Sequence, residues 1–368
     1  MFRRYLTVLK NFDWVLFGAI FLLISFGLAA LFSIALSAAP PDFLNFKKQL
    51  IFAGLGLALL FILSFLNYRF WQHLSLMIYL GVALLLLLVI FFGTTIRGTT
   101  GWFSFFGFNF QPVELAKVAL ILILAWFLNH YSHQLNQLKF FLLSGAIAGL
   151  YFLLVIFQPD FGSGIILVLI WFWLMLLGRA KKIHLGAIIL GAIFIFIFAW
   201  FFLFAPYQKD RILTFFDPGR DPYNRGYHVR QAVTAVGAGG FLGRGLGFGS
   251  QSQLKFIPAS QTDFIFAVIA EELGLLGVSL ILGFWAIFFY RLYKAAMMTR
   301  DNFSFYFILG VSALFFSQVM INIGMNIGLV PVTGVSLPFV SYGGSFLVVS
   351  LILVGLVESM IVRNKLGS

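Results

Sequence analysis

Residues 14–37 read WVLFGAIFLLISFGLAALFSIALS, without a single charged side chain. A helix of this length would cross the hydrocarbon core of a bilayer, which takes about 20 apolar residues. The whole chain is 61% hydrophobic and only 10% charged, and its mean hydropathy is +1.02. Soluble domains do not have this composition. The sequence therefore predicts a membrane protein.

Further apolar stretches follow, so we predict an all-α polytopic membrane protein with about ten transmembrane helices. The predicted spans are residues 14–37, 47–66, 74–95, 112–129, 138–157, 162–178, 183–204, 263–290, 303–327 and 345–362. The first span is too long for a signal-peptide core and others follow it, so we expect it to be retained. The connections are short except for residues 205–262. We expect a single integral membrane domain, residues 1–368, with one large loop inside it.

The basic residues of the short connections predict the orientation of the spans. One side carries Arg3, Arg4, Lys10, Arg69, Lys139, Arg179, Lys181, Lys182, Arg291, Lys294, Arg300, Arg363 and Lys365. The short connections of the other side carry only Lys47, Lys48 and Arg97. The first side, with both termini, is predicted to be cytoplasmic, which makes the long loop extracytoplasmic. The net charge of +12 is divided between two membrane faces, so we expect no nucleic-acid partner.

The long loop ends at Asp263, where the eighth predicted span begins. A carboxylate at the mouth of a membrane helix is costly and usually marks a functional site. The preceding loop is basic. Its cations are Lys209, Arg211, Arg220, Arg225, Arg230, Arg244 and Lys255. This pattern favours a base acting on an anionic, lipid-borne substrate. The structural alternative is a helix cap made by Asp263 with Thr262.

Several kinds of chemistry are excluded by residues that the chain lacks. It has no cysteine, which rules out disulfides, thiol nucleophiles and thiolate metal sites. Its five histidines form no HExxH-type cluster, and there is no GxxxxGK[ST] phosphate loop. Chemistry must therefore come from carboxylates, basic residues and amides near the outer leaflet.

Three charged residues in or next to the predicted spans can have either a structural or a functional role. Glu114 and Lys117 are three residues apart and share one helix face. They form either a self-neutralising pair or the polar wall of a cavity, with Lys117 facing phosphate. Asp160 precedes Phe161 to Gly164, so it either caps the next helix or contacts a substrate or metal.

The ninth predicted span carries Gln318, Asn322 and Asn326, which lie on one stripe because they are four residues apart. Such amides either bond neighbouring helices or bind a ligand. Glu271 and Glu272 follow Asp263 by two helical turns or more, and we expect loop or helix-end donors to satisfy them.

Two apolar stretches rich in glycine and proline or aromatic residues interrupt the helical pattern. They are RGTTGWFSFFGFNFQ at 97–111 and LVPVTGVSLPFVSYGGS at 329–345. Non-helical backbone at membrane depth must line a cavity or be buried in protein. We therefore expect re-entrant or interfacial segments on the same side as Asp263, bordering an outward-facing cavity.

Four motifs resemble the SEDS (shape, elongation, division and sporulation) family, whose members include RodA and FtsW. FIPASQTDFIFAVIAEELGLLG at 256–277 is similar to the family signature. QPVELAK at 111–117 is similar to its QPSELxK element, and QPDFGSG at 158–164 to QPDLGT. NIGMNIGLVPVTGVSLPFVSYGGS at 322–345 matches the last-loop signature almost throughout. YHVRQA with GSQSQLKFIP looks more like RodA than FtsW. Gln261 stands where the family usually has histidine.

The resemblance implies a glycosyltransferase of peptidoglycan biosynthesis in the bacterial cytoplasmic membrane. It implies polymerisation of lipid II, and of polyprenyl-diphosphate-linked glycan, during cell elongation or division. It also implies partners, namely a class B penicillin-binding protein with transpeptidase activity and other membrane proteins of the elongation or division complex. In the family the aspartate matching Asp263 is essential, and its glutamate–lysine pair and QPD aspartate match Glu114, Lys117 and Asp160.

Sugar transfer from a polyprenyl diphosphate needs a base near the acceptor hydroxyl and positive charge on the leaving diphosphate. One carboxylate suffices for a direct displacement that inverts the anomeric carbon, and we predict Asp263 as that base. The predicted substrate-binding residues are Lys117, Glu114, Asp160, Arg211, Gln318 and Asn322. The sequence demands no cofactor, and a divalent cation, Mg²⁺ or Mn²⁺, is an alternative helper.

Two other functions stay open at this point. A flippase for lipid-linked precursors would also need a polar cavity among apolar helices, and a non-catalytic scaffold of the wall-synthesis complex would need no base. A flippase requires an opening to the inner side, whereas the polar residues gather toward the outer side. This distribution favours the enzyme.

Overall fold

The computed structural model describes residues 2–37, 40–96, 98–105, 108–178, 180–202 and 225–366, with the isolated positions 209, 213 and 215. In this part of the chain nine helices are long and apolar enough to cross a membrane. They are α2 (Trp14–Leu36), α3 (Leu44–Phe65), α5 (Ser75–Phe92), α6 (Pro112–Tyr131), α7 (Leu138–Ile156), α9 (Lys182–Phe202), α13 (Ile265–Met298), α14 (Asn302–Asn326) and α15 (Gly344–Leu366). A tenth apolar helix, α8 (Phe161–Leu177), is shorter. The predicted all-α polytopic fold is confirmed.

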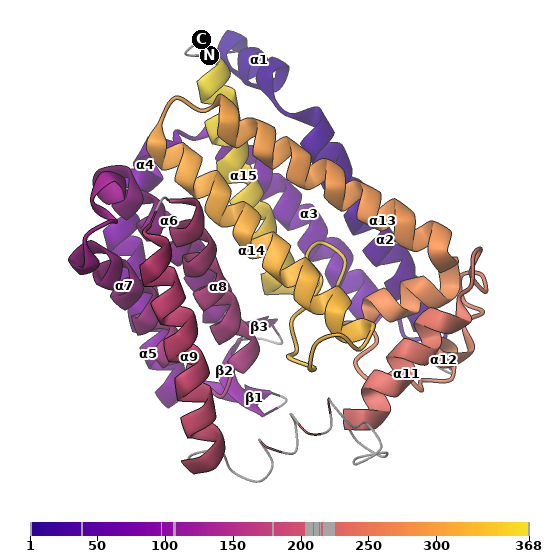
Figure 1. Ribbon diagram of the computed structural model, residues 1–368. Coiled ribbons are helices and arrows are strands. Elements are labelled where there is room, and N and C mark those ends of the chain that lie inside the picture. The colour runs from indigo at the N-terminus through magenta and orange to yellow at the C-terminus, as the bar shows by residue number, and fades with distance from the viewer. Residues whose placement is uncertain are drawn as a thin grey trace.

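Short elements mark the two ends of the bundle (Figure 1). The end with both termini carries α1 (Phe2–Asn11), α4 (Tyr68–His73) and the 3-10 turn Ser132–Gln134. The opposite end carries α11 (Arg225–Ala238), α12 (Ser250–Gln253) and three strands. We call these the terminal face and the distal face. The expected 205–262 loop is therefore partly helical where the structure describes it.

Where the structure describes it, the segment expected to be re-entrant or interfacial forms a small sheet at the distal face. Strands β1 (Thr94–Ile96), β2 (Thr99–Phe105) and β3 (Phe108–Phe110) pair antiparallel in that order. Pairing satisfies the backbone hydrogen bonds that an irregular segment would leave open.

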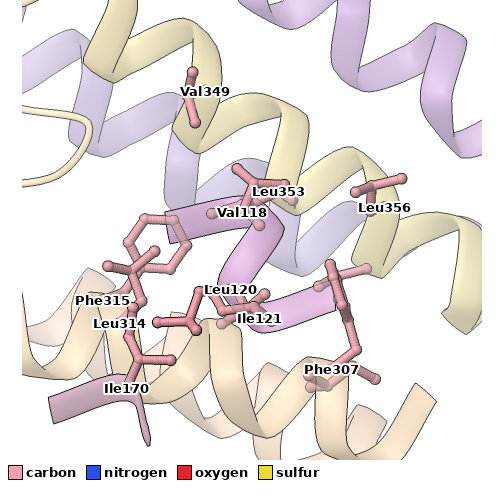
Figure 2. Close-up of a cluster of buried hydrophobic side chains, with 14 of the residues drawn as sticks. Val118, Leu120, Ile121, Ile170, Phe307, Leu314, Phe315, Val349, Leu353 and Leu356 are labelled. Atoms are coloured by element: carbon pink, nitrogen blue, oxygen red, sulfur yellow. The ribbon is translucent and has the colours of Figure 1, made fainter. Parts of the chain in front are cut away.

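Helix α6 occupies the middle of the bundle. Its side chains Val118, Leu120 and Ile121 pack among residues of α8, α14 and α15 (Figure 2). A closely packed apolar core of this kind fixes the positions of the helices around it. Helix α9, in contrast, is exposed along nearly all of its length.

Helix α13 is kinked and longer than expected. It runs on to Met298 instead of ending near residue 290, and Gly274 inside it has φ 63° and ψ −161°. A residue with a side chain rarely adopts this conformation, so glycine permits the break. The break separates a short distal half, which follows Asp263, from a long half that crosses the bundle.

Candidate active site

Asp263 lies just before α13 and does not cap it. The N-cap residue is Phe264, without a side-chain bond, so the helix-cap interpretation of Asp263 is wrong. The backbone carbonyl of Asp263 instead accepts hydrogen bonds from the side-chain amides of Asn322 and Asn326, both at 3.0 Å. The structure thus fixes this residue through its main chain, and its side chain is half-buried.

The amide stripe of α14 serves this fixation. Asn326 also accepts the N–H of Ala267 at 3.1 Å, and Asn322 also donates to the carbonyl of Val335 at 2.8 Å. Both asparagines are fully buried. For Asn322 and Asn326, the expectation that such amides bond neighbouring segments is confirmed, and a substrate contact of Asn322 stays a prediction.

The second irregular segment, residues 329–343, lies directly against Asp263. Gly334 has φ 76°, and a Cβ placed on it would lie 3.9 Å from Asp263 Oδ2. The Ser341 hydroxyl donates to the carbonyl of Thr262 at 2.6 Å, and the Tyr342 N–H donates to that of Gln261 at 2.8 Å. Gln261 and Thr262 are therefore held to this segment by one backbone bond and one bond from a serine hydroxyl, and we call this arrangement around Asp263 the clasp.

Two glutamines complete this clasp, and only Gln49 had no signal in the sequence beyond its presence in an apolar stretch. Buried Gln49 of α3 donates to the Ser341 carbonyl at 3.1 Å and accepts the Gly343 N–H at 3.1 Å. Gln261, at the position where the family usually has histidine, accepts from the Asn45 amide at 2.6 Å. Burial raises the pKa of Tyr342, so its hydroxyl stays protonated at neutral pH and is no candidate base.

Asp160 caps α8, as one of its two interpretations predicted. Its Oδ1 accepts the N–H of Ser163 at 3.0 Å, and its Oδ2 accepts the Gln111 amide at 3.2 Å. The start of α8 touches the Asp263 clasp, because a Cβ on Gly162 would lie 2.4 Å from the carbonyl oxygen of Thr333. A direct role of Asp160 toward substrate or metal stays a prediction.

Glu114 and Lys117 form the predicted ion pair. Their Nζ–Oε1 distance is 2.7 Å and both side chains are buried. The Lys117 ammonium also lies 5.6 Å from the centre of the Phe346 ring, a cation–π contact that helps to hold a charge away from water. Whether Lys117 also faces phosphate stays a prediction.

Gln318 lies at nearly the same level along the helix bundle as this ion pair. Gly310 of α14 faces Ile121 of α6, and the two helices run in opposite directions. Moving seven residues back along α6 and eight forward along α14, about 10 to 12 Å, brings Gln318 close to the level of Glu114. Its Oε1 is buried without a hydrogen-bond partner in the described part of the chain. This orphaned acceptor keeps Gln318 a predicted substrate contact, whereas Arg211 lies outside the described residues.

Glu271 and Glu272 are structural, as expected. Glu271 accepts the N–H groups of Gln251 and Ser252 at 2.7 and 2.9 Å, which are the free donors at the start of α12. Glu272 accepts from the Ser33 hydroxyl at 2.5 Å. Through these hydrogen bonds the two glutamates connect the chain after α11, and Ser33 of α2, to the kink of α13.

A cavity of about 360 Å³ lies beside this tie, lined by Leu28, Ala29, Phe32, Ser33, Leu36, Phe46, Leu246 and Gly247. Its lining is apolar and does not include Asp263. The expected outward-facing cavity at Asp263 therefore stays a prediction.

Metal binding is not supported by the residues present. Within the described residues no three His, Asp or Glu side chains come together as a metal-binding group, and both oxygens of Asp160 already accept hydrogen bonds. A divalent cation would have to be held largely by the substrate diphosphate.

The fold and this cluster define a polytopic membrane protein with one carboxylate clasped at its distal face. The model of the cell cycle protein family FtsW/RodA/SpoVE matches residues 13–366. The chain belongs to this family.

Relatives and a solved structure are similar over nearly the whole chain. The probable peptidoglycan glycosyltransferase FtsW of Geobacter metallireducens is 34% identical, over 99% of this chain and 98% of its own length. The peptidoglycan glycosyltransferase MrdB of Escherichia coli K12 is 36% identical, over 90% of each. A structure described as structural coordination of polymerization and crosslinking by a peptidoglycan synthase complex has a TM-score of 0.83 and 30% identity, covering 97% of this chain and 99% of that chain. Since differently named relatives are about equally similar, the closer likeness to RodA than to FtsW stays a prediction.

Proposed function

We propose that this protein is a peptidoglycan glycosyltransferase that polymerises lipid II, with Asp263 as the base. The observation that carries the proposal is the placement of this carboxylate at the distal face. Two buried asparagines hold its backbone carbonyl, and its Oδ2 lies beside Gly334, a residue without a side chain. Relatives named peptidoglycan glycosyltransferase over nearly the same length support the activity.

The proposed reaction is a direct displacement. Asp263 takes the proton of the acceptor sugar hydroxyl, whose oxygen forms a bond to the anomeric carbon of the donor. The bond from that carbon to the diphosphate oxygen breaks, and the polyprenyl diphosphate leaves with the electron pair. Attack opposite the leaving group inverts the anomeric carbon. The cations of the segment before Asp263 would stabilise the diphosphate.

We further propose that the terminal face is cytoplasmic and the distal face extracytoplasmic in the bacterial inner membrane. Short connections at the terminal face carry most of the basic residues. Asp263 then faces the compartment in which glycan strands are assembled. A class B penicillin-binding protein is the proposed partner, since a similar chain is part of a complex that couples polymerisation with crosslinking.

The flippase alternative would need a polar path to the terminal face. Past its first turn, α6 is buried among apolar residues such as Phe307, Leu314 and Leu356 (Figure 2). This apolar layer supports an enzyme that works from the distal face.

Polymerisation of labelled lipid II by the purified protein, with and without its transpeptidase partner, tests the proposal. Glycan strands should form with the wild-type chain and be absent with Asp263→Asn. Translocation of lipid II across vesicle membranes without polymer formation would instead establish the flippase. If the protein shows neither activity, the scaffold is the remaining alternative.

A further inference from the structure

A second polar site lies at the terminal face, away from Asp263. It is a hollow of about 230 Å³ lined by Asn67, Tyr68, Arg69, Thr299, Arg300, Asp301, Ser304, Met360, Arg363 and Asn364. We call it the terminal-face pocket. Its walls come from three places that are distant in sequence, the start of α4, the turn from α13 to α14, and the end of α15.

The pocket has an excess of positive charge. Arg69, Arg300 and Arg363 line it, against Asp301 as its one carboxylate. The Oδ2 of Asp301 is turned to the first turn of α14, where it accepts the N–H and the hydroxyl of Ser304 at 3.1 and 3.0 Å. The lining therefore carries three guanidinium groups and one carboxylate.

The frame of the pocket is fixed by hydrogen bonds. Arg363 donates to the carbonyl of Phe65 at 2.9 Å, which ties α15 to the end of α3. The Arg300 N–H donates to the Asn364 side chain at 3.3 Å, and the Asn364 amide donates to the carbonyl of Met298. A pocket whose walls are tied together in this way loses little entropy when it binds a ligand.

The geometry points to a binding site for the phosphate headgroup of an anionic phospholipid. Guanidinium groups match phosphate oxygens bidentately, and basic pockets between transmembrane helices at the cytoplasmic side bind such headgroups. The volume is below the roughly 300 to 1,000 Å³ typical of drug-sized ligands, so a headgroup fits better than a nucleotide.

Apolar neighbours of the lining residues favour a lipid over free phosphate. Leu66, Phe70 and Met298 expose 45%, 58% and 51% of their surface, and each is next in sequence to a residue of the pocket. Acyl chains attached to a bound headgroup would cover them. Inorganic phosphate has no apolar group that could cover these side chains.

Native mass spectrometry of the purified full chain tests the site. Phosphatidylglycerol and phosphatidylethanolamine with the same acyl chains are titrated against wild type, Arg69→Gln/Arg300→Gln and the control Lys139→Gln/Lys182→Gln. The control removes two exposed cations outside the pocket lining. We expect the wild type to prefer phosphatidylglycerol and the arginine pair of changes to weaken its binding about tenfold, since charged hydrogen bonds are lost. The control should bind like wild type.

Several results would overturn the inference. If both double variants bind phosphatidylglycerol equally weakly, the lipid is attracted by the general surface charge and not by the pocket. If the wild type binds the two lipids equally, the pocket does not recognise the headgroup. Inorganic phosphate that binds as tightly as the lipid would rule out the acyl-chain contribution. If the glutamine variant fails to fold, Arg69→Lys/Arg300→Lys replaces it and should bind more weakly than wild type while keeping its preference for phosphatidylglycerol.

Discussion

At the scale of single residues, Asp263 is positioned through its backbone carbonyl. Because Asn322 and Asn326 bind that carbonyl and asparagine has nearly the same shape as aspartate, Asp263→Asn should leave the fold unchanged. Loss of the proposed base should lower lipid II polymerisation by at least about 10²-fold. Gel analysis of glycan products and thermal unfolding in detergent measure both quantities.

The matched control for this change is Asp42→Asn. Asp42 is an exposed carboxylate whose Oδ1 accepts the N–H of Leu44 at the start of α3. This variant should polymerise lipid II at the wild-type rate. Wild-type turnover by Asp263→Asn would remove Asp263 as the base.

The buried pair Glu114–Lys117 gives a second prediction. Removing either partner leaves an unpaired charge in the core, which costs about 3 to 5 kcal/mol of stability. Glu114→Ala and Lys117→Ala should each unfold at lower temperature, and the double change should cost less than the sum of the two. A double-mutant cycle on unfolding, with exposed Lys139→Ala as a neutral control, measures the coupling. Additive losses would show that the pair is not energetically formed.

At the scale of elements, the kink of α13 depends on the absence of a side chain. A Cβ on Gly274 would lie 2.2 Å from the backbone nitrogen of Gly243. Alanine at this position would also have to adopt the positive φ that Gly274 has. Gly274→Ala should therefore displace the chain after α11, which donates two N–H groups to the backbone carbonyls of Glu271 and Glu272. We expect a loss of stability above about 1 kcal/mol together with reduced polymerisation.

Gly283 on the same helix is the matched control. A Cβ there meets nothing within 4 Å, so Gly283→Ala should be neutral or stabilise the helix by up to about 1 kcal/mol. If both alanine variants behave alike in thermal unfolding, the close approach at Gly274 does not hold the kink.

The elements also show which parts of the fold the sequence could predict. Spans such as Trp14–Leu36 follow from uninterrupted apolar length alone, as does the sixth span despite its shorter helix. The strands at 94–110 and the helix Arg225–Ala238 were missed because neighbouring segments, not local pattern, decide them. The kink at Gly274 was missed because a single glycine is tolerated in many straight helices.

The candidate site was predictable to a similar degree. The ion pair of Glu114 and Lys117 follows from helical spacing, and Asp160 as a cap from its place before a helix. The clasp through Gln49 and Ser341 could not be predicted, since it joins residues 292 positions apart. The carbonyls that Asn322 meets could not be predicted either, because spacing gives its helix face but not its partners.

At the scale of the whole molecule, the two faces differ in chemistry, and the apolar layer around α6 separates them (Figure 2). The clasped carboxylate lies at the distal face and the arginine pocket near the terminal face. If the terminal face is cytoplasmic, sugar transfer and lipid headgroup binding take place on opposite sides of the membrane.

The chain has no cysteine, so single introduced thiols can test this orientation directly. Pro41, between α2 and α3, and Lys139, at the start of α7, are both exposed and lie on opposite faces. In spheroplasts a membrane-impermeant maleimide should label Pro41→Cys and spare Lys139→Cys until detergent is added. Labelling after detergent shows that both thiols are reactive. The reverse pattern would place Asp263 on the cytoplasmic side, where a polymerase of extracytoplasmic glycan could not act, and would exclude the proposed function in its present form.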